Sequence, residues 1–411
     1  MQNLTHDTID ILKANYDTAW KRIDMSTLFI ELGYKLINSE GTVNYITSNQ
    51  FLSTEYGRKM REFFVEKQAV RQIVDFGDLR VFENAMTYVS IFFVAKRKNS
   101  KFTYARIKEL PFIAPIEFDL MDIQSLSGEA WSLGNNDVGK VLGKIINNAS
   151  CMLSSVAKPS YGIVTGKDDV LMFDLDEKVD IEDELILPVI RAQGCDRYSD
   201  AFPSKKVVYP YEFQNSNTSL IELDNIKTKF PKMYKYIMEN SVPLKERKDS
   251  RNLFGNRVGW YGLVRFGQLE TFMKPKIVTP GEVKHNKFCI DNTKSGFTGA
   301  RVFAITVEDE TVDIRYLLAL LNSKVVEFFM HHTASLKAGG YYSYSTSALE
   351  KIPIIIADNQ NEYIELVDEI MEKKRCAENT TALENQIEEK IFGLYELNDE
   401  EIDIIRKDLE D

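Results

Sequence analysis

The densest structural signal in this chain lies at Tyr45–Lys98, which reads YITSNQFLSTEYGRKMREFFVEKQAVRQIVDFGDLRVFENAMTYVSIFFVAKRK. Two runs rich in Val, Ile and Phe, Val70–Phe76 and Thr87–Ala95, predict strands. Thr54–Glu66 predicts a helix, because its apolar residues recur at spacings of three and four. These elements are typical of the second half of an α/β sheet that ends in an antiparallel edge hairpin.

The residues before this stretch extend the same pattern. Thr5–Trp20 and Asp24–Asn38 have helical apolar spacing, and Val43–Thr47 predicts a buried strand. The apolar face predicted for the second helix consists of Leu28, Phe29, Leu32 and Leu36. The N-terminal region therefore alternates helices and strands, as an α/β layer does.

Composition narrows the class of protein. A chain of 411 residues predicts two or three domains. No apolar run reaches the roughly 18–20 residues that cross a bilayer, and the polar N-terminus is unlike a signal peptide, so we expect a cytoplasmic protein with no membrane partner. The cysteines and histidines are too scattered for a zinc site, so we expect no bound metal.

Charge is distributed unevenly along the chain. Residues 362–411 hold 17 acidic and 6 basic side chains, whereas residues 200–301 hold 18 basic and 10 acidic ones. The net charge of −11 therefore resides in the C-terminal segment. The basic segment is a candidate phosphate-facing surface, and the alternative is a solvated basic surface without a ligand.

Four regions follow from these patterns. Residues 1–100 predict a partial α/β domain, 101–153 a connecting region, 154–356 a mixed α+β domain with short strands, and 357–411 an acidic helical tail. Within the third region, Ser219–Glu239 and Val312–His331 predict helices. The expected fold class is thus α/β plus α+β.

Several motifs in the first region resemble the catalytic domain of gamma-class N6-adenine DNA methyltransferases of the type IIG, Eco57I-like restriction–modification family. They are LFIELG at Leu28–Gly33, the strand Thr42–Thr47, SNQFL at Ser48–Leu52 and VFENA at Val81–Ala85. The resemblance implies the back half of a methyltransferase-like, Rossmann-type sheet. It also implies that Phe82 packs on a flipped adenine, and the alternative is that Phe82 is ordinary core.

The motifs that perform methyl transfer in that family are not found in this sequence. No Pro-Pro pair exists for an Asn-Pro-Pro-Tyr loop, and Val74–Asp78 suggests a cofactor loop but lacks its second glycine. We therefore expect no catalytic residue and no bound cofactor in this chain alone. The resemblance implies that the complete enzyme uses S-adenosylmethionine and that an N-terminal methyltransferase half or subunit, encoded upstream of Met1, supplies the missing groups.

The third region resembles the TaqI-type C-terminal specificity domain, which recognises the DNA target. The motifs are YGIVTGKD at Tyr161–Asp168, LPVIR at Leu187–Arg191, WY at Trp260–Tyr261 with Arg265, FMKPKIVTP at Phe272–Pro280, LLALLNS at Leu317–Ser323, KAGGYYSY at Lys337–Tyr344 and LEKIPI at Leu349–Ile354. Each motif is weak alone, but their order and spacing are specific. Glu388–Ile402 in the tail also resembles the terminal segment of such enzymes.

Basic, glycine and aromatic residues in these motifs are candidate contacts to double-stranded DNA. Lysine and arginine neutralise phosphates, a Gly-Gly pair allows close backbone approach, and tyrosine stacks or donates a hydrogen bond. The candidates are Lys245, Arg247, Lys248, Arg251, Lys274, Lys276, Lys337, Gly339, Gly340, Tyr341, Tyr342 and Tyr344. For each aromatic residue the alternative is core packing.

Three functions fit these observations. The first is the DNA-recognition part of an adenine-specific restriction–modification enzyme that needs its N-terminal half for methylation. The second is a stand-alone specificity or scaffold subunit that docks a separate methyltransferase, and the third is an inactive remnant. No nuclease motif distinguishes them.

Overall fold

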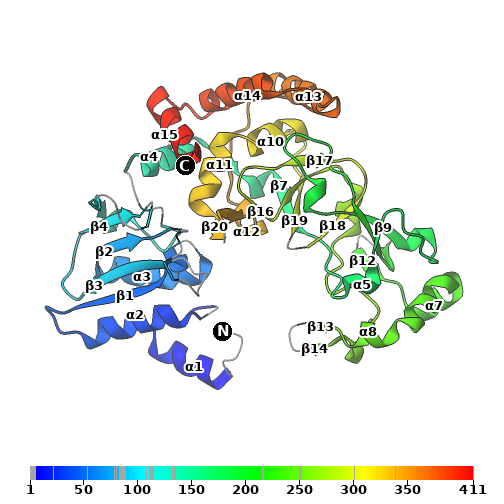
Figure 1. Ribbon diagram of the computed structural model, residues 1–411, viewed down its shortest axis with the longest axis horizontal. Coiled ribbons are helices and arrows are strands. Elements are labelled where there is room, and N and C mark those ends of the chain that lie inside the picture. Colours follow the sequence, from blue (N-terminus) through cyan, green and yellow to red (C-terminus); the bar gives the residue numbers. More distant parts are fainter. Residues whose placement is uncertain are drawn as a thin grey trace. The chain divides into compact units, whose positions relative to one another are not determined.

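The computed structural model describes residues 6–410, except 22, 53, 78, 80, 83–88, 108, 111–114, 132, 134–135, 215–216, 250–251, 300 and 338. The chain forms two compact units (Figure 1). Unit 1 comprises residues 1–147, 329–342 and 399–411, and unit 2 comprises residues 148–328 and 343–398. In the described part of the chain, no helix is both long and apolar enough to cross a membrane.

Unit 1 is built on a five-stranded sheet with the order β1-β3-β2-β4-β5. The strands are β1 (Thr42–Ser48), β2 (Val70–Asp75), β3 (Val89–Ala95), β4 (Lys101–Arg106) and β5 (Asp119–Asp122). β3 runs antiparallel to both β1 and β2, whereas β2 and β4 are parallel. The carboxyl ends of β1, β2 and β4 therefore point the same way.

Two features of this sheet differ from the prediction. β2 and β3 pair antiparallel as expected, but β3 lies between β1 and β2 rather than at the edge. β4 and β5 come from the region predicted as a connector, so the sheet extends past residue 100. Apolar runs predicted β1, β2 and β3 but not β4 and β5, and strand order depends on tertiary pairing that no local pattern encodes.

Helices from both ends of the chain contribute to unit 1. They are α1 (His6–Asn15), α2 (Met25–Leu36), α3 (Arg58–Lys67), α4 (Asn136–Asn148) and α15 (Asp399–Glu410). Met60, Phe63 and Phe64 of α3 are buried, as their spacing predicted. They pack with Phe92 of β3 and Trp131 in the main core of this unit.

The predicted burial of α2 and β1 is wrong in detail. α2 buries Thr27, Leu28, Ile30, Glu31 and Gly33, whereas Phe29 and Leu36 are exposed. The helix turns this way because the carboxylate of Glu31 accepts hydrogen bonds from the backbone N–H groups of Asp17 and Thr18, at 3.1 and 2.9 Å. β1 has exposed residues at alternate positions and is not a buried strand.

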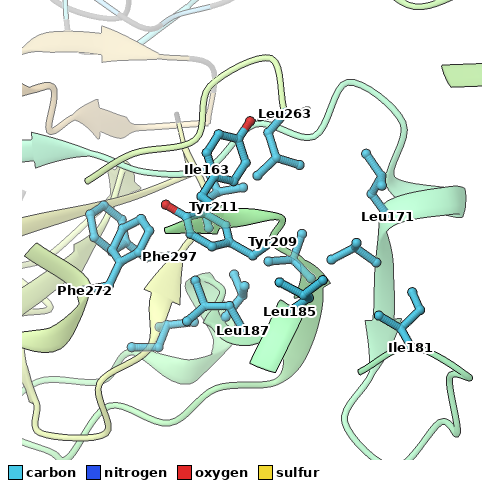
Figure 2. Packing of buried hydrophobic residues seen from close by; sticks show 14 of the residues in the cluster. Ile163, Leu171, Ile181, Leu185, Leu187, Tyr209, Tyr211, Leu263, Phe272 and Phe297 are labelled. Atoms are coloured by element: carbon cyan, nitrogen blue, oxygen red, sulfur yellow. Dashed lines mark hydrogen bonds between the residues drawn. The ribbon is translucent and has the colours of Figure 1, made fainter. Parts of the chain in front are cut away.

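Unit 2 contains two four-stranded sheets. The first has the order β17-β15-β19-β7, formed by Cys289–Asp291, Lys276–Pro280, Val302–Val307 and Ala157–Tyr161. The second has the order β18-β9-β10-β8, formed by Gly296–Phe297, Ile186–Ile190, Lys205–Val208 and Met172–Asp174. Figure 2 shows the apolar core of this unit, in which Tyr209, Tyr211, Phe272 and Phe297 are buried with aliphatic side chains such as Leu185 and Leu187.

Short elements complete unit 2. The small strands are β6 (Cys151–Met152), β11 (Tyr211–Gln214), β12 (Asn217–Leu220), β13 (Lys248–Asp249), β14 (Asn252–Leu253), β16 (Glu282–Val283) and β22 (Pro353–Ile354). The helices are α5 (Asp168–Leu171), α6 (Leu223–Lys229), α7 (Pro231–Glu239), α8 (Ser241–Lys245), α9 (Leu269–Met273), α10 (Ile314–Leu321), α12 (Thr346–Leu349), α13 (Asn361–Arg375) and α14 (Thr381–Leu394). α11 (Lys324–Thr333) begins in unit 2 and ends in unit 1.

Each long helix predicted in this region is divided into two. α6 and α7 are separated at Phe230, because Pro231 begins the second helix. α10 and α11 are separated at Asn322, whose side chain exchanges hydrogen bonds of 3.0 and 2.9 Å with the backbone of Phe288. Since this pairing involves a residue distant in the sequence, the apolar periodicity could not reveal the break.

The predicted acidic tail is helical but does not form a compact unit of its own. α13 and α14 belong to unit 2, and α15 belongs to unit 1. Arg197 forms ion pairs of 2.8 and 3.2 Å with Glu384 and Glu388 of α14. The hydroxyl of Tyr395 donates to the carbonyl of Pro353 at 2.7 Å. These contacts join α14 and the residue that follows it to unit 2, and α13 buries Tyr363, Val367, Ile370 and Met371.

Candidate nucleic-acid interface

Arg247 is a buried hub of unit 2 rather than a surface cation. Arg247 is only 4% exposed. Its guanidinium donates hydrogen bonds to four backbone carbonyls, those of Leu244, Thr165, Trp260 and Gly262, at 2.9, 2.6, 2.7 and 2.8 Å. Burial lowers the pKa of Arg247 to about 10, which leaves the group charged at neutral pH. The prediction that Arg247 contacts DNA is therefore wrong in this structure: the residue positions the loops around it.

The segments held by this hub present an exposed group of cations. Lys245 at the end of α8 and Lys248 at the start of β13 are both exposed. Lys245 also lies 4.6 Å from the ring centroid of Trp260. Arg251, predicted in the same set, lies outside the described residues.

Two further arginines join this group, and the list of candidate contacts did not include them. Asp249 accepts hydrogen bonds from Arg257 and Arg265, at 3.0 and 3.2 Å. These two guanidiniums lower the pKa of the Asp249 carboxyl below its usual value. The sequence analysis included Arg265 only as part of a motif. Arg257 could have been identified from its position in a basic, glycine-rich segment. We call Lys245, Lys248, Arg257 and Arg265 the cationic loop group.

The two lysines predicted near α9 have different environments. Lys274 is exposed and pairs with Glu270 at 2.6 Å. Lys276 is fully buried in β15, where its ammonium lies 2.5 Å from a carboxylate oxygen of Asp291 and donates to the carbonyl of Phe272 at 2.8 Å. Burial lowers the pKa of Lys276, and Asp291 opposes that shift. The prediction of a DNA contact is wrong for Lys276.

The KAGGYYSY motif forms a glycine turn between β20 (Ser335–Lys337) and β21 (Tyr341–Ser343). Gly339 and Gly340 have φ angles of +77° and +76°, a conformation that other residues rarely adopt. Lys337 is partly exposed, Tyr341 is exposed, and Tyr342 stacks on His331 with ring centroids 3.9 Å apart. These residues therefore remain candidate contacts. Lys337, Tyr341 and Tyr342 belong to unit 1, whereas the cationic loop group belongs to unit 2.

Tyr344, at the end of the same motif, is part of the core of unit 2. It is fully buried, its hydroxyl donates to the side-chain oxygen of Asn286, and its ring lies 5.9 Å from that of Phe288. The core alternative is therefore the correct one for this tyrosine, and the predicted DNA contact is wrong.

A polar cavity of about 120 Å³ lies in unit 1, beyond the carboxyl ends of β1, β2 and β4. Asn49, Asp75 and Arg106, from the ends of these strands, line it together with Trp131, His331, His332 and Tyr342. Ligands of open α/β sheets bind at such strand ends. The sequence signal for this cavity was Val74–Asp78, which resembled a cofactor loop.

Asp75 organises the wall of this cavity. Its carboxylate accepts hydrogen bonds from Asn49, Gly77, Ser90 and Tyr104, at 2.7, 3.1, 2.9 and 3.2 Å. Burial, with Asp75 nearby, raises the pKa of Tyr104 well above its usual value, so its hydroxyl stays protonated and donates. Among the described residues no cluster of histidine, cysteine, aspartate or glutamate could hold a metal ion.

Phe82, the candidate for packing on a flipped base, is 42% exposed. This exposure is larger than a core phenylalanine has, which favours the pocket interpretation over the core alternative. The rest of its VFENA motif, from Glu83, lies outside the described residues. The role of Phe82 therefore stays a prediction.

Comparison with known proteins identifies the class to which these elements belong. Residues 1–82 match the family of the Eco57I restriction-modification methylase, and residues 216–354 match the TaqI-like C-terminal specificity domain. The chain therefore contains one region similar to an Eco57I-type restriction-modification methylase and another similar to a TaqI-like specificity domain. This confirms the resemblance seen in the sequence.

Two relatives and one solved structure show how far the similarity extends. The chain is 26% identical over 390 residues to the type II restriction enzyme and methyltransferase RM.Eco57I of Escherichia coli, which covers 87% of this chain and 39% of that protein. It is 26% identical over 426 residues to the type II methyltransferase M.BstVI of Geobacillus stearothermophilus, covering 97% and 72%. Its fold is similar to that of the type IIL restriction-modification enzyme MmeI, solved in complex with DNA, with a TM-score of 0.66 at 9% identity over 98% of this chain and 54% of MmeI.

Proposed function

We propose that this chain is the sequence-specific DNA-recognition part of an adenine-specific (N6) DNA methyltransferase. The observation that carries the proposal is the cationic loop group, which lies in the part of the chain that matches a specificity domain. Asp249 pairs with two of its cations, Arg257 and Arg265, and Arg247 binds the carbonyls of Trp260 and Gly262 in the same loop. Fixed cations on a hydrogen-bonded scaffold suit contacts to DNA phosphates and base edges.

Methylation would require a second part of the enzyme. The sequence has no Pro-Pro pair and no glycine-rich cofactor turn, so the proposal assigns S-adenosylmethionine binding and chemistry to a methyltransferase half outside this chain. The chain spans 39% of the length of RM.Eco57I and 72% of that of M.BstVI. Phe82 would then contribute to the base pocket of the assembled enzyme.

Unit 1 has an edge that such a partner would cover. Among the described strands, β1 is hydrogen-bonded to β3 alone, which leaves its outer edge open. Exposed apolar side chains flank this edge: Phe29 and Leu36 on α2, and Ile46 on β1. The hydroxyl of Tyr45 donates to the carbonyl of Phe29, so α2 lies on the Tyr45 face and Ile46 on the opposite face. A partner that adds a strand at β1 would bury apolar groups on both faces.

The second candidate function is a specificity subunit that docks a separate, complete methyltransferase. The same open edge favours it, so the two candidates differ in what the partner must contain. In the first case a fragment that ends after the Asn-Pro-Pro-Tyr loop restores methylation. In the second case only a complete methyltransferase does so.

The test measures DNA binding and methylation separately. We expect the purified chain to shift a duplex in a mobility assay and to incorporate no label from radioactive S-adenosylmethionine. Addition of an N-terminal methyltransferase fragment that ends after an Asn-Pro-Pro-Tyr loop should produce N6-methyladenine. Methyl transfer by the chain alone, or the absence of duplex binding, would refute the proposal.

A further inference from the structure

Val258 stands out on the surface of unit 2. It is 99% exposed, more than any other large apolar residue in the described part of the chain. A single exposed aliphatic residue is ordinary, but this one lies in a loop whose neighbours are unusually well fixed. The loop runs from Phe254 to Leu263.

The loop is anchored immediately after Val258. A Cβ atom added to Gly259 would lie 2.6 Å from Cδ2 of Leu220, so the glycine lies close against that side chain. The carbonyl of Trp260 accepts from Arg247 at 2.7 Å. The hydroxyl of Tyr261 donates to the carbonyl of Ile221 at 2.7 Å. Every residue from 259 to 261 is therefore held against the body of the unit.

The loop is also anchored before Val258. The ring of Phe254 is buried and lies 4.5 Å from the guanidinium of Arg247 and 4.3 Å from that of Arg257. The backbone N–H of Arg257 donates to the carbonyl of Phe254 at 2.9 Å. Val258 is thus the protruding point of a fixed loop, and little conformational entropy remains to be lost when it meets a ligand.

The surroundings of Val258 are cationic rather than apolar. Arg257 precedes it, and Asp249 holds Arg257 and Arg265 together. Lys245 and Lys248 complete the cationic loop group, whose four positive charges exceed the two negative charges of Asp249 and the exposed Glu246. An apolar protein partner would leave these charges desolvated, whereas a DNA groove places phosphates beside them.

We propose that Val258 reads a thymine through apolar contact with the 5-methyl group in the major groove. This inference rests on the proposed DNA-recognition function. The 5-methyl group is the only apolar feature of the major-groove edge, and small aliphatic side chains recognise it. Valine is too short to act as a wedge between base pairs, a role filled by larger residues such as Phe, Leu and Met. The neighbouring arginines bind phosphates of the DNA backbone and so hold the loop in the groove, while Val258 discriminates between bases.

The experiment begins with selection of binding sites. The full chain is incubated with a randomised DNA duplex library, and bound sequences are compared for the parent, Val258→Ala and Val242→Ala. Val242 on α8 is the matched control, because it is 64% exposed and lies outside the loop from Phe254 to Leu263. We expect Val258→Ala to lose preference at one thymine position and to keep the rest of the consensus, whereas Val242→Ala keeps all of it.

A second measurement isolates the methyl group. In the selected duplex, uracil replaces that thymine and removes only the 5-methyl. The parent should bind this duplex about fourfold more weakly, the equivalent of one buried methyl-sized group, while Val258→Ala should bind both duplexes equally. Because Val258 is fully exposed, thermal unfolding of the variant should match that of the parent.

The outcomes separate the two proposals. If the parent binds no duplex and enriches no sequence, the proposed function fails together with this inference. If the parent enriches a sequence that Val258→Ala retains at every position, only this inference is overturned. A consensus without thymine, or equal sensitivity of parent and variant to uracil, overturns it as well.

Discussion

At the scale of single residues, Arg247 shows how one buried cation can organise a binding surface. Its guanidinium joins four carbonyl groups, two of which lie in the loop that carries Val258. Lysine would keep the charge but has a single nitrogen, so it cannot reach all four acceptors. We expect Arg247→Lys to reduce the free energy of unfolding by about 3 kcal/mol, because buried carbonyls lose their donors. Urea titration measures this change.

The exposed Arg265 provides the control for that substitution. Arg265→Lys should change stability by less than about 1 kcal/mol, since its ion pair with Asp249 is solvated. Arg247→Lys should weaken DNA binding only to the extent that it loosens the loop. A large loss of DNA affinity with unchanged stability would show that Arg247 contacts DNA directly and would contradict its role as a hub.

Glu31 gives unit 1 a dependence on pH. Burial raises the pKa of its carboxyl, but hydrogen bonds from Lys35, Thr18 and Asp17 lower it more, so the folded-state pKa lies below the usual 4.5. A depressed pKa stabilises the fold above pH 4.5, and this contribution is lost as pH falls through the lower folded value. We expect Glu31→Gln to destabilise the protein by about 1–3 kcal/mol at pH 7.

Unfolding curves at several pH values check this expectation. The stability difference between parent and Glu31→Gln should shrink as the pH falls below 4.5, where the parent carboxyl becomes protonated too. A difference that stays constant into strong acid would mean that the charge of Glu31 contributes nothing. Glu40, which lies in an exposed turn, is a suitable control, and Glu40→Gln should have little effect at any pH.

At the scale of strands and helices, Lys276 and Asp291 join β15 to β17 as directly opposed partners. Because both side chains are fully buried, removal of one leaves an unpaired charge in the core. We expect Lys276→Met to cost about 3–5 kcal/mol of stability. The double variant Lys276→Met/Asp291→Asn should be more stable than Lys276→Met, since asparagine carries no charge and still accepts from Thr293.

The exposed Lys274 is the control for this pair. Lys274→Met should change stability by less than about 1 kcal/mol, because its ion pair with Glu270 lies at the surface. Calorimetry of the four proteins gives the comparison. If the double variant is no more stable than Lys276→Met, the buried charge of Asp291 is not the cause of the loss.

The same elements show what a sequence can predict. The sequence pattern located α3, β2 and β3, because most of their buried residues are Met, Phe, Val and Ile side chains, although Arg61 and Ser90 are buried as well. It failed on α2, where the buried Glu31 determines which face turns inward. It also missed the helix break at Asn322, because the partner of that side chain, Phe288, is 34 residues away. Local patterns therefore identify elements but not the polar contacts that orient or interrupt them.

The candidate interface was predicted less well than the fold, for a physical reason. The sequence alone does not reveal whether a lysine, arginine or tyrosine is exposed to solvent or is buried with hydrogen-bond partners. Arg247, Lys276 and Tyr344 belong to the second kind, and their partners become visible only in the tertiary structure. Val258 is the opposite case. A valine in a sequence suggests a core position, and only the 99% exposure of Val258 in the structure distinguishes it.

At the scale of the whole molecule, net charge and local charge act in opposite directions. The chain carries −11, yet residues 362–411 alone account for that value, and the rest has equal numbers of acidic and basic side chains. Distant charges are screened beyond about 8 Å at physiological ionic strength. DNA binding should therefore follow the cationic loop group rather than the negative total.

Salt dependence measures how many cations of this group contact phosphates. If all four do so, the logarithm of the binding constant should fall with the logarithm of salt at a slope of about −3.6, a loss on the order of 100-fold between 50 and 200 mM. The double variant Lys245→Gln/Lys248→Gln should reduce the slope by about 1.8. Fluorescence anisotropy with a labelled duplex gives both slopes, and Lys232→Gln, an exposed α7 lysine paired with Asp180, serves as the control. A flat dependence, or a slope that the double variant does not change, would mean that DNA is bound by another surface of the chain.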